Sequence, residues 1–394
     1  MIIAGANSEK YDYIKLLKYL LWLFVLVTIA DSIQKLSLGE KVFWGHKQTF
    51  YNNYVIFKTS FKHLVDGVNL YGQYNEEYGD YYKYSPTFAA LMMPFYYLPD
   101  WIGLVVWDLL NCILLYYGIF HLPRLTAKSK FFILSFSFIE LLTSLQNSQS
   151  NAMIAGLLLL AFVCMEKEKF PLATLLIMIC FYIKLTGILA CVLFLFYDKK
   201  LKFILWSAFW FVVLGAIPLV FTDLQTLINQ YKNWGILLAD DHSQSHGISV
   251  LGIISSWFSV EPSKTIVLVS GIFLFLLPLL KIQRFRDFDY RLLYLCSLLI
   301  WIVIFNHKAE SPSYIVAIVP CAIWYISGVK NKWNLGLIIL AFILTSLSPT
   351  DLFPKPIRLN YVIPYSLKAL PAVLIWIMIG YELMMGRKIK DELN

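Results

Sequence analysis

The chain has 394 residues, of which 59% are hydrophobic and only 15% are charged, and its net charge is +8. A soluble domain carries roughly 25% charged residues, so this composition excludes an ordinary soluble protein and indicates an integral membrane protein. Basic residues that flank membrane helices account for the positive charge, and no nucleic acid partner is needed to explain it.

Long apolar runs follow one another along the whole chain. A membrane helix needs about 20 mostly apolar residues, and neighbouring residues complete the shorter runs. We therefore expect one all-α, polytopic membrane domain over residues 1–394. The runs are Leu16–Ala30, Trp101–Phe120, Phe131–Leu145, Ala152–Met165, Pro171–Tyr197, Phe203–Phe221, Thr265–Leu280, Leu292–Phe305, Tyr314–Val329, Leu335–Leu347 and Ala369–Met385.

The first run is interpreted as a membrane anchor rather than a cleaved signal peptide. Asp31 and a polar stretch follow it, where a signal peptide would have small residues at a cleavage site. We expect a multi-pass protein of the cell inner (cytoplasmic) membrane.

Two stretches interrupt this regular pattern. Pro86, Pro94 and Pro99 divide the segment that precedes Trp101–Phe120, which is either a kinked spanning helix or a re-entrant half-helix. The choice decides on which side the basic turn at 123–130 lies. Lys184, with Thr186 and Gly187 after it, predicts a bend that divides Pro171–Tyr197 into two short helices.

The distribution of Lys and Arg predicts the orientation. Lys10, Lys15 and Lys18 place the N-terminus in the cytoplasm, together with four short basic connections. These connections are Asp198–Lys202, Lys281–Arg291, Lys330–Lys332 and Gly386–Lys390. The non-cytoplasmic segments are then a large first loop at residues 31–85, a second loop at 222–249, and shorter connections at 306–313 and 350–365. The polar residue types gather in these segments, so we expect the chemistry on this side.

All six cysteines lie inside apolar runs and lack the spacing of metal ligands. We interpret them as small buried residues, and we expect neither a metal ion nor a cofactor. They are Cys112, Cys164, Cys180, Cys191, Cys296 and Cys321.

Ionisable residues inside apolar runs are functional candidates, because they are costly in lipid. For Lys184 we consider two interpretations: a structural lysine that reaches an interface or pairs with a buried acid, and a cation that binds a lipid phosphate. For Asp108 and Glu140 we expect structural polar pairing within the helix bundle.

Two polar connections are further candidates. Gln149 and Asn151 form either a plain polar loop or a substrate contact. His307, Lys308 and Glu310 crowd one tight turn, which is either solvated or able to bind a phosphate.

Several short motifs resemble a known family. Residues 52–71 form an aromatic and small-residue segment that ends in Gly67 and Tyr71, and a Tyr-x-Tyr-Ser-Pro stretch then opens the run that ends in Leu98-Pro99. This pattern is similar to glycosyltransferase family 87, whose members use polyprenyl-phosphate mannose and have a GT-C fold. The chain also resembles a branch of the family found in Bacteroidetes.

Later motifs extend the resemblance in the same order. Residues 148–151 resemble the family's Gly-Gln-x-Asn, residues 184–187 resemble its Lys-x-x-Pro, and residues 242–247 resemble an Asn-Gln-Ser-type segment. The resemblance implies substrate contacts for Asn53, Tyr82, Tyr84 and His246, together with Gln149, Asn151 and Glu310.

One departure concerns the base. The family has an aspartate early in the first loop, and this position falls on Asn53, whose amide cannot act as a base. If the enzyme is active, Asp80, Glu77 or Glu76 must replace it. We favour Asp80, which is the acid nearest to the Tyr84–Pro86 segment where the chain enters the membrane.

The implied reaction is the inverting transfer of a hexose, most simply mannose, from a polyprenyl-phosphate sugar to a lipid-linked, glycan or protein acceptor. A carboxylate takes the acceptor proton, while Lys184, His307 and Lys308 are the cations available for the donor phosphate. Two other functions stay open. A transporter or lipid flippase would show internal repeats and glycine-broken helices at matching positions, and we see no clear repeat. A non-catalytic assembly subunit would explain Asn53.

Overall fold

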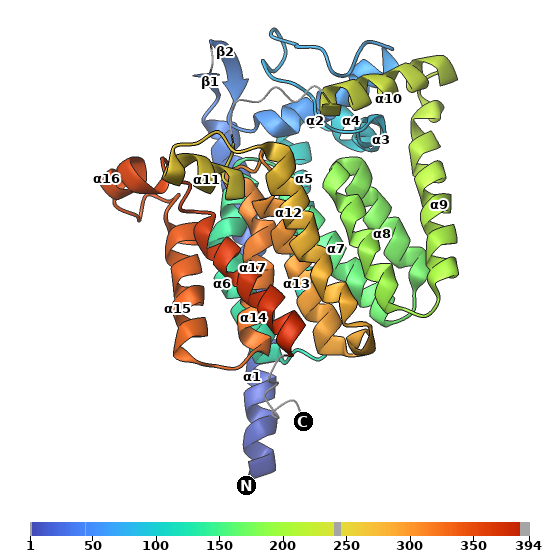
Figure 1. Ribbon diagram of the computed structural model, residues 1–394. Coiled ribbons are helices and arrows are strands. Elements are labelled where there is room, and N and C mark those ends of the chain that lie inside the picture. The colour runs from blue at the N-terminus through green and yellow to red at the C-terminus, as the bar shows by residue number, and fades with distance from the viewer. Residues whose placement is uncertain (1, 44, 240–245, 387–394) are drawn as a thin grey trace.

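The structure is a computed structural model, which describes residues 2–43, 45–239 and 246–386. It is a bundle of helices that run between two ends of the molecule (Figure 1). In chain order the helical elements are α1 (Ile2–Ser37), α2 (Asn52–Val65), α3 (Pro86–Leu91), α4 (Met93–Tyr97), α5 (Asp100–Phe120), α6 (Ala127–Gln146), α7 (Asn151–Glu166), α8 (Phe170–Ile183), η1 (Leu185–Phe196), α9 (Lys200–Ala216), η2 (Ile217–Val220), α10 (Leu224–Ala239), α11 (Val250–Phe258), α12 (Lys264–Leu276), η3 (Leu277–Leu280), η4 (Ile282–Arg284), α13 (Phe288–Ile304), η5 (Ser311–Tyr314), α14 (Ile315–Ser327), α15 (Lys332–Leu340), η6 (Ala341–Leu347), α16 (Lys355–Ile357), η7 (Arg358–Val362) and α17 (Leu370–Met385).

The helices agree with a polytopic membrane protein. Within the described residues, Asp12–Ser37, Asp100–Phe120 and Lys200–Val220 are each long and apolar enough to cross a bilayer. Further apolar helices are shorter and lie beside them in the bundle; they are Asn151–Glu166, Phe170–Ile183, Leu185–Phe196, Lys264–Leu280, Ser311–Ser327, Lys332–Leu347 and Leu370–Met385. The expectation of an all-α membrane domain is thereby confirmed.

The first helix is longer than its apolar run. α1 continues past Ala30 to Ser37, so residues 31–37 are helical, and the irregular part of the first loop begins only after them. Asp31, Ser32 and Lys35 are buried because they lie on one face of the helix, three or four residues apart. Their hydrogen bonds and ion pairs across the bundle satisfy these polar groups, so the helix continues through a stretch that is polar in sequence.

A small hairpin is the departure from an all-α fold in the described part of the chain. Strand β1 (Glu40–Phe43) pairs antiparallel with β2 (His46–Thr49), with Phe43 opposite His46. Gly45 has φ +82°, a conformation that a two-residue hairpin turn requires and that glycine adopts without strain. The hairpin lies with α2, α3, α4 and α10 at one end of the molecule, which we call the loop end (Figure 1).

The proline-rich segment before α5 does not cross the bundle. It folds as α3 and α4, two short helices at the loop end (Figure 1). Ser85 caps α3 by accepting a hydrogen bond from the backbone N–H of Phe88, and Pro86 occupies the first helical position. The chain therefore returns to the end where it entered, and α5 makes the crossing. Of the two predicted alternatives, the structure favours the re-entrant one.

The predicted bend at Lys184 is confirmed. α8 ends at Ile183, and Lys184 has an extended backbone (φ −136°, ψ 125°) before η1 begins. A Cβ on Gly187 would lie 2.5 Å from the carbonyl carbon of Cys180, so the two segments pack closely only because residue 187 is glycine. η1 is a 3-10 helix of 12 residues, which at about 2.0 Å per residue extends roughly 24 Å.

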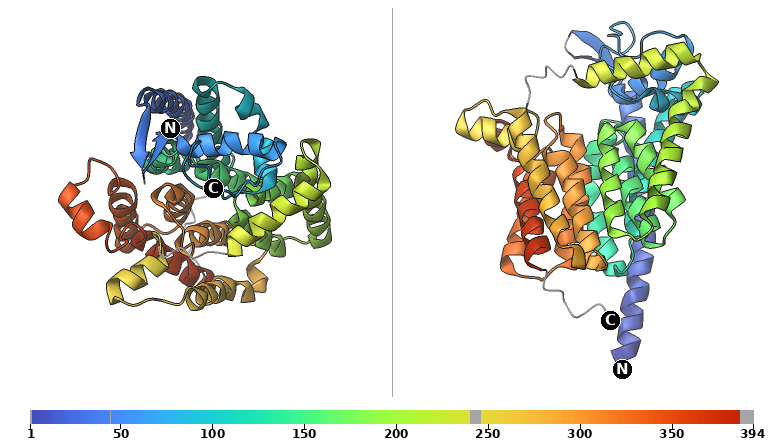
Figure 2. Two further views of the ribbon diagram at one scale, coloured as in Figure 1. Left: turned by 90° about the horizontal axis from the view of Figure 1, so that it is seen from above. Right: turned by 45° about the vertical axis from the view of Figure 1, so that its right-hand side comes forward.

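The basic connections gather at the opposite end, which we call the basic end. The helix order places there the turn at 123–130 after α5 and the connections at 198–202, 281–287 and 329–331 (Figures 1 and 2). The helices up to α10 and those from α11 onward lie side by side, and α1 projects beyond the others at the basic end (Figure 2).

The cysteines are as expected from the sequence. All six are free; five are buried, and Cys191 is half-buried. None can therefore crosslink the described elements, and the fold depends on packing and polar contacts alone.

We predict that an impermeant maleimide added to intact cells labels Asn75→Cys, in the first loop, but labels Lys332→Cys, at the basic end, only after the membrane is permeabilised. Asn75 and Lys332 are both exposed in the structure, so accessibility depends on the side of the membrane. From the Lys and Arg bias we expect the basic end to lie in the cytoplasm. The unmodified protein gives the background from its buried cysteines. The reverse labelling pattern would contradict this orientation.

Candidate functional site

Four of the polar residues selected from the sequence form one hydrogen-bonded chain at the loop end. Lys184 Nζ donates to Asn151 Oδ1 at 2.6 Å, and Asn151 Nδ2 donates to Gln149 Oε1 at 2.6 Å. Gln149 Nε2 then donates to Glu310 Oε2 at 2.9 Å. Three connections that are distant in sequence meet here: the bend after α8, the turn between α6 and α7, and the turn after α13. We call these four side chains the Lys184–Glu310 chain.

The chain has a defined direction. Each amide accepts through its oxygen on the lysine side and donates through its nitrogen on the glutamate side, which is the only order that connects an ammonium to a carboxylate. A cation and an anion are thus held apart by two amides. The Lys184 ammonium and the Glu310 carboxylate each keep unused hydrogen-bonding capacity, while their hydrogen bonds to the two amides fix their positions.

Lys184 is not paired directly with an acid. Among the described residues, no carboxylate lies within 4.0 Å of its ammonium, and Asn151 accepts one of its three hydrogens. The half-buried ammonium therefore has donors available for an anion. The structural interpretation of Lys184 had two forms, and this geometry does not show the pairing with a buried acid.

Lys35 stabilises the turn that carries Gln149 and Asn151. The Lys35 ammonium donates to the carbonyl of Leu145 and, at 3.0 Å, to Ser148 Oγ. Trp107 Nε1 donates to the Ser148 carbonyl at 2.9 Å. Ser148 has φ +49°, which costs a non-glycine residue conformational energy, so these contacts stabilise an otherwise unfavourable backbone.

Lys35 also forms the centre of a buried ionic cluster. Its Nζ lies 2.8 Å from Asp108 Oδ2 and 3.0 Å from Asp31 Oδ2, and Ser32 Oγ donates to Asp108. Lys35 is 4% exposed and Asp108 is fully buried. The structural pairing expected for Asp108 is confirmed, but the sequence analysis missed Lys35. The four-residue spacing from Asp31 on a continuing helix was the signal that could have revealed it.

Asn53, where the family pattern has an aspartate, contacts the same turn. It lies near the start of α2, and its Nδ2 donates to the Asn147 carbonyl at 2.9 Å. An aspartate carboxylate has no hydrogen to donate to that carbonyl. The asparagine therefore has a contact of its own that fits an amide and not an acid.

The acids of the first loop differ in their surroundings. Glu77 Oε2 lies 2.7 Å from Nε2 of the buried His63, whose ring stacks on Tyr74 at 3.9 Å. Burial lowers the pKa of His63, and the charge of Glu77 opposes that shift. Glu76 is exposed. The contact between Glu77 and His63 thus holds the first loop against α2.

Asp80 is the third acid of the first loop. Its Oδ1 accepts a hydrogen bond from the Tyr81 backbone N–H at 2.7 Å and lies 3.9 Å from Lys83 Nζ. Burial raises the pKa of Tyr84, and the charges of Glu310 and Asp80 add to this shift.

Tyr82 has a structural environment. It is fully buried, and its hydroxyl donates to the Ser85 carbonyl at 2.7 Å, just ahead of α3. Tyr84 is half-buried, and its carbonyl accepts from the Tyr71 hydroxyl at 3.0 Å. Of these two tyrosines, only Tyr84 has Glu310 among the groups that raise its pKa.

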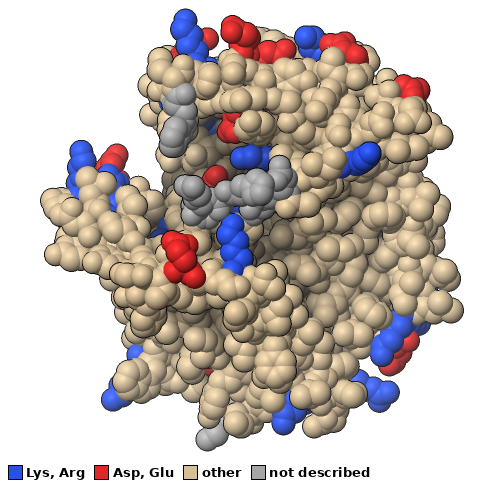
Figure 3. Space-filling model, turned by 45° about the horizontal axis from the view of Figure 1, so that its top comes forward, with Lys and Arg blue, Asp and Glu red and all other residues tan. Residues whose placement is uncertain are grey.

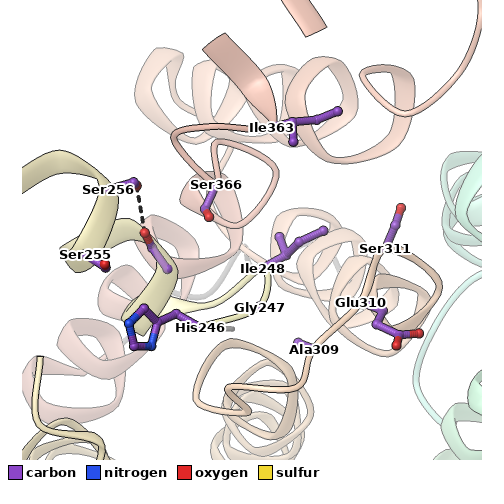
Figure 4. A pocket seen from close by; sticks show the side chains of 11 residues that line it. His246, Gly247, Ile248, Ser255, Ser256, Ala309, Glu310, Ser311, Ile363 and Ser366 are labelled. Carbon is purple, nitrogen blue, oxygen red and sulfur yellow. Dashed lines mark hydrogen bonds between the residues drawn. The ribbon is translucent and has the colours of Figure 1, made fainter. Parts of the chain in front are cut away.

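A cavity of about 500 Å³ lies next to Glu310. At the loop end the surface is hollowed, with acidic and basic side chains in and around the hollow (Figure 3). In Figure 4, Glu310 lies on one side of the cavity and points away from His246, which lies on the other side. The cavity is lined by His246, Gly247, Ile248, Gly252, Ser255, Ser256, Ala309, Glu310, Ser311, Ile363 and Ser366.

Close backbone packing shapes this cavity. The Ile248 N–H donates to the Ala309 carbonyl at 2.8 Å, and a Cβ on Gly247 would lie 2.5 Å from the His307 carbonyl oxygen. Gly247 also has φ +56°, so glycine is required here for two reasons. His246 Nε2 lies 2.9 Å from Glu261 Oε2. His307 is half-buried and Lys308 is exposed in the adjoining turn.

A second buried ion pair supports the cavity. Lys368 Nζ lies 2.8 Å from Glu140 Oε1 and donates to Ser311 Oγ at 2.8 Å. Both charged side chains are almost fully buried. The pairing expected for Glu140 is confirmed, and Lys368 is a residue that the sequence analysis missed. A lysine next to the last apolar run was the available signal, because a buried acid needs a cation.

The site thus contains a half-buried ammonium, a carboxylate and a hydroxyl-lined cavity, in this order in space. An ammonium can bind a phosphate, and a carboxylate can take a proton from a hydroxyl group. In the part of the chain that the structure describes, no group of three or more His, Cys, Asp or Glu side chains is arranged to hold a metal ion.

Comparison with known proteins identifies a family. The model of Glycosyltransferase family 87 matches residues 82–306, which is more than half of the chain. The matched region includes Tyr84, Gln149, Asn151 and Lys184. It begins after Asn53 and Asp80 and ends before Glu310. No curated protein matches the chain.

We predict that Lys35→Met lowers the free energy of unfolding by about 3–5 kcal/mol, because it leaves two buried carboxylates without a counter-charge. The measurement is the thermal unfolding midpoint of the purified protein in detergent. Lys199→Met is the matched control, since Lys199 pairs with Glu168 at the surface and such pairs contribute little. An unchanged midpoint in Lys35→Met would show that the cluster does not stabilise this turn.

Proposed function

Because this chain belongs to glycosyltransferase family 87 and is a membrane glycosyltransferase, we propose that it transfers a hexose, with mannose favoured, from a polyprenyl-phosphate sugar. The acceptor is a lipid-linked, glycan or protein hydroxyl, and the anomeric configuration is inverted. The reaction takes place at the loop end, on the non-cytoplasmic side of the inner membrane.

The observation that carries this proposal is the position of Lys184. The polyprenyl phosphate leaves with increasing negative charge on its oxygens, and a fixed cation stabilises that charge. The Lys184 ammonium is half-buried and oriented by a neutral amide, and the described residues place no carboxylate within 4.0 Å of it. Since an ammonium and an anion attract more strongly away from bulk water, this position suits a phosphate.

The surrounding structure fits a lipid-linked donor. The bend that exposes Lys184 lies at the loop end of α8 and η1, both of which are apolar helices. A prenyl chain can thus lie along apolar helices while its phosphate reaches the ammonium. The phosphate ester is already an activated leaving group, so the reaction needs no nucleotide. His307 and Lys308, in the turn next to Glu310, are further candidates for binding the phosphate.

The reaction also needs a base. Inverting transfer requires one carboxylate to accept the proton of the attacking hydroxyl. Glu310 is the acid of the Lys184–Glu310 chain and Asp80 is an acid of the first loop, whereas Glu77 is paired with His63. The environments of Asp80 and Glu310 differ in a way that distinguishes their roles.

We predict that Lys184→Met weakens binding of a short-chain polyprenyl-phosphate hexose by about 10- to 150-fold. This range corresponds to the loss of one hydrogen bond to a charged group, about 1.5–3 kcal/mol. Binding is measured by retention of labelled donor on the purified protein, and turnover by product formation. Lys332→Met, an exposed lysine at the basic end, is the control that should match the unmodified chain.

Two outcomes would contradict the proposal. Donor binding that is unchanged in Lys184→Met would remove Lys184 from the phosphate site. An unmodified chain that binds the donor but never forms product, with any acceptor class offered, would instead favour a non-catalytic subunit. Movement of the intact donor across vesicles, with no product, would favour a flippase.

A further inference from the structure

The cavity beside Glu310 has a chemistry of its own. We infer that it is the acceptor site, that it binds a polyhydroxylated group such as a sugar ring, and that Glu310 takes the proton of the attacking hydroxyl. The inference rests on the proposed glycosyl transfer, and it adds the class of acceptor and the identity of the base.

The lining of the cavity suits a sugar. Ser255, Ser311 and Ser366 provide hydroxyls that can donate or accept, while Ile248 and Ile363 provide apolar surface for the C–H faces of a ring. Binding sites for small molecules typically enclose about 300–1,000 Å³, and a volume of about 500 Å³ falls in that range. The lining contains a single carboxylate, that of Glu310, and no lysine or arginine.

Gly252 allows close packing at the wall of the cavity. A Cβ on Gly252 would lie 2.7 Å from Ser366 Oγ and 2.3 Å from the Gly247 carbonyl oxygen. Any side chain at residue 252 would therefore displace the Ser366 hydroxyl or the strand-like segment at 246–248. The glycine at this position lets α11 approach both.

Ser311 is oriented by a buried cation. Its Oγ accepts a hydrogen bond from Lys368, which is itself paired with Glu140. Because the lysine occupies a lone pair of the hydroxyl, the serine hydrogen must point elsewhere, and in the described residues it has no acceptor. A ligand oxygen in the cavity can serve as that acceptor. Burying an ion pair in a membrane protein costs free energy. Here the Lys368–Glu140 pair fixes the Ser311 hydroxyl as a hydrogen-bond donor at the cavity wall.

Glu310 borders both parts of the site. Its Oε2 accepts from Gln149 and is thereby connected to Lys184 through the two amides. Its Oε1 has no partner among the described residues, and the side chain lines the cavity. A donor phosphate at Lys184 and an acceptor in the cavity would thus meet at Glu310.

Asp80 fits the role of base less well. One of its oxygens accepts the Tyr81 N–H, Lys83 lies 3.9 Å away, and it is not part of the cavity lining. An acceptor bound in the cavity would therefore have the Glu310 carboxylate at its wall and not that of Asp80. The structure therefore assigns the proton transfer to Glu310 and a supporting position to Asp80.

The chemical step balances without a further reactant. The acceptor oxygen forms a bond to the anomeric carbon on the face opposite the phosphate. The bond between that carbon and the phosphate oxygen breaks, and its electron pair leaves with the polyprenyl phosphate. The acceptor proton passes to Glu310 Oε1, and Lys184 stabilises the departing phosphate. Glu310 later returns the proton to solvent.

The test separates donor binding from transfer. The purified full chain receives a short-chain polyprenyl-phosphate hexose as donor and octyl hexosides as acceptor probes. Glu310→Gln preserves the shape of the side chain and can still accept from Gln149, so we expect donor retention within about twofold of the unmodified chain. Loss of general base catalysis should lower the transfer rate by about 10²–10⁴-fold. Asp351→Asn, an exposed acid paired with Arg358 at the loop end, is the matched control and should keep full activity.

A second variant tests the cavity itself. Ser255→Leu places bulk in the cavity without touching the Lys184–Glu310 chain, and should raise the acceptor KM by at least about tenfold while donor retention is unchanged. Ser270→Leu, an exposed serine on α12, adds the same bulk outside the cavity and is its control.

Each contrary result has a distinct meaning. Normal transfer in Glu310→Gln together with a collapse in Asp80→Asn would return the role of base to Asp80. An unchanged acceptor KM in Ser255→Leu would place the acceptor elsewhere. If Glu310→Gln loses donor retention as well, Glu310 positions the donor and is not the base. An unmodified chain that does not consume the donor would contradict the proposed function itself, independently of these variants.

Discussion

The structure at the loop end depends on one buried ammonium. Lys35, 4% exposed, connects α1 to α5 through Asp108 and connects both to the turn between α6 and α7. A charge in a membrane interior is tolerated only where partners surround it, so the position of Lys35 also fixes the positions of the groups it contacts. The strained backbone at Ser148 lies among these groups. Gln149 and Asn151 follow it directly, and their amides can connect Lys184 to Glu310 only if the turn keeps this conformation.

The two buried ion pairs divide the site between them. Lys35 and Asp108 hold the turn that carries Gln149 and Asn151, whereas Lys368 and Glu140 hold Ser311 at the cavity. Each pair joins helices that are far apart in sequence. Since removing one partner of a buried pair is far more costly than losing a surface contact, both sides of the site are built on contacts that the fold cannot easily rearrange. Glu310 lies between the two sides, in a turn rather than in a helix.

The sequence predicts the chemistry of this site better than its geometry. Lys184, Gln149, Asn151 and Glu310 are recognisable because polar residues in or beside apolar runs are costly and must be satisfied. Their order in one chain cannot be predicted, because it depends on three turns meeting in space. The bend at Lys184 is predictable, since Lys, Thr and Gly interrupt an apolar run.

Other features were missed for physical reasons. The end of α1 is wrong by seven residues because Asp31 and Lys35 look like loop residues until a partner such as Asp108 is known. Lys35 and Lys368 are missed for the same reason: a buried acid predicts a cation but not which one. The substitution at residue 53 becomes meaningful only in the structure. An aspartate there would present lone pairs to the Asn147 carbonyl, whereas Asn53 donates a hydrogen bond to it. The chain thus uses this position to hold the turn, and in the reaction that we propose the acid comes from another segment. We propose Glu310 for this role; it lies in the turn after α13, at the opposite end of the same hydrogen-bonded chain from Lys184.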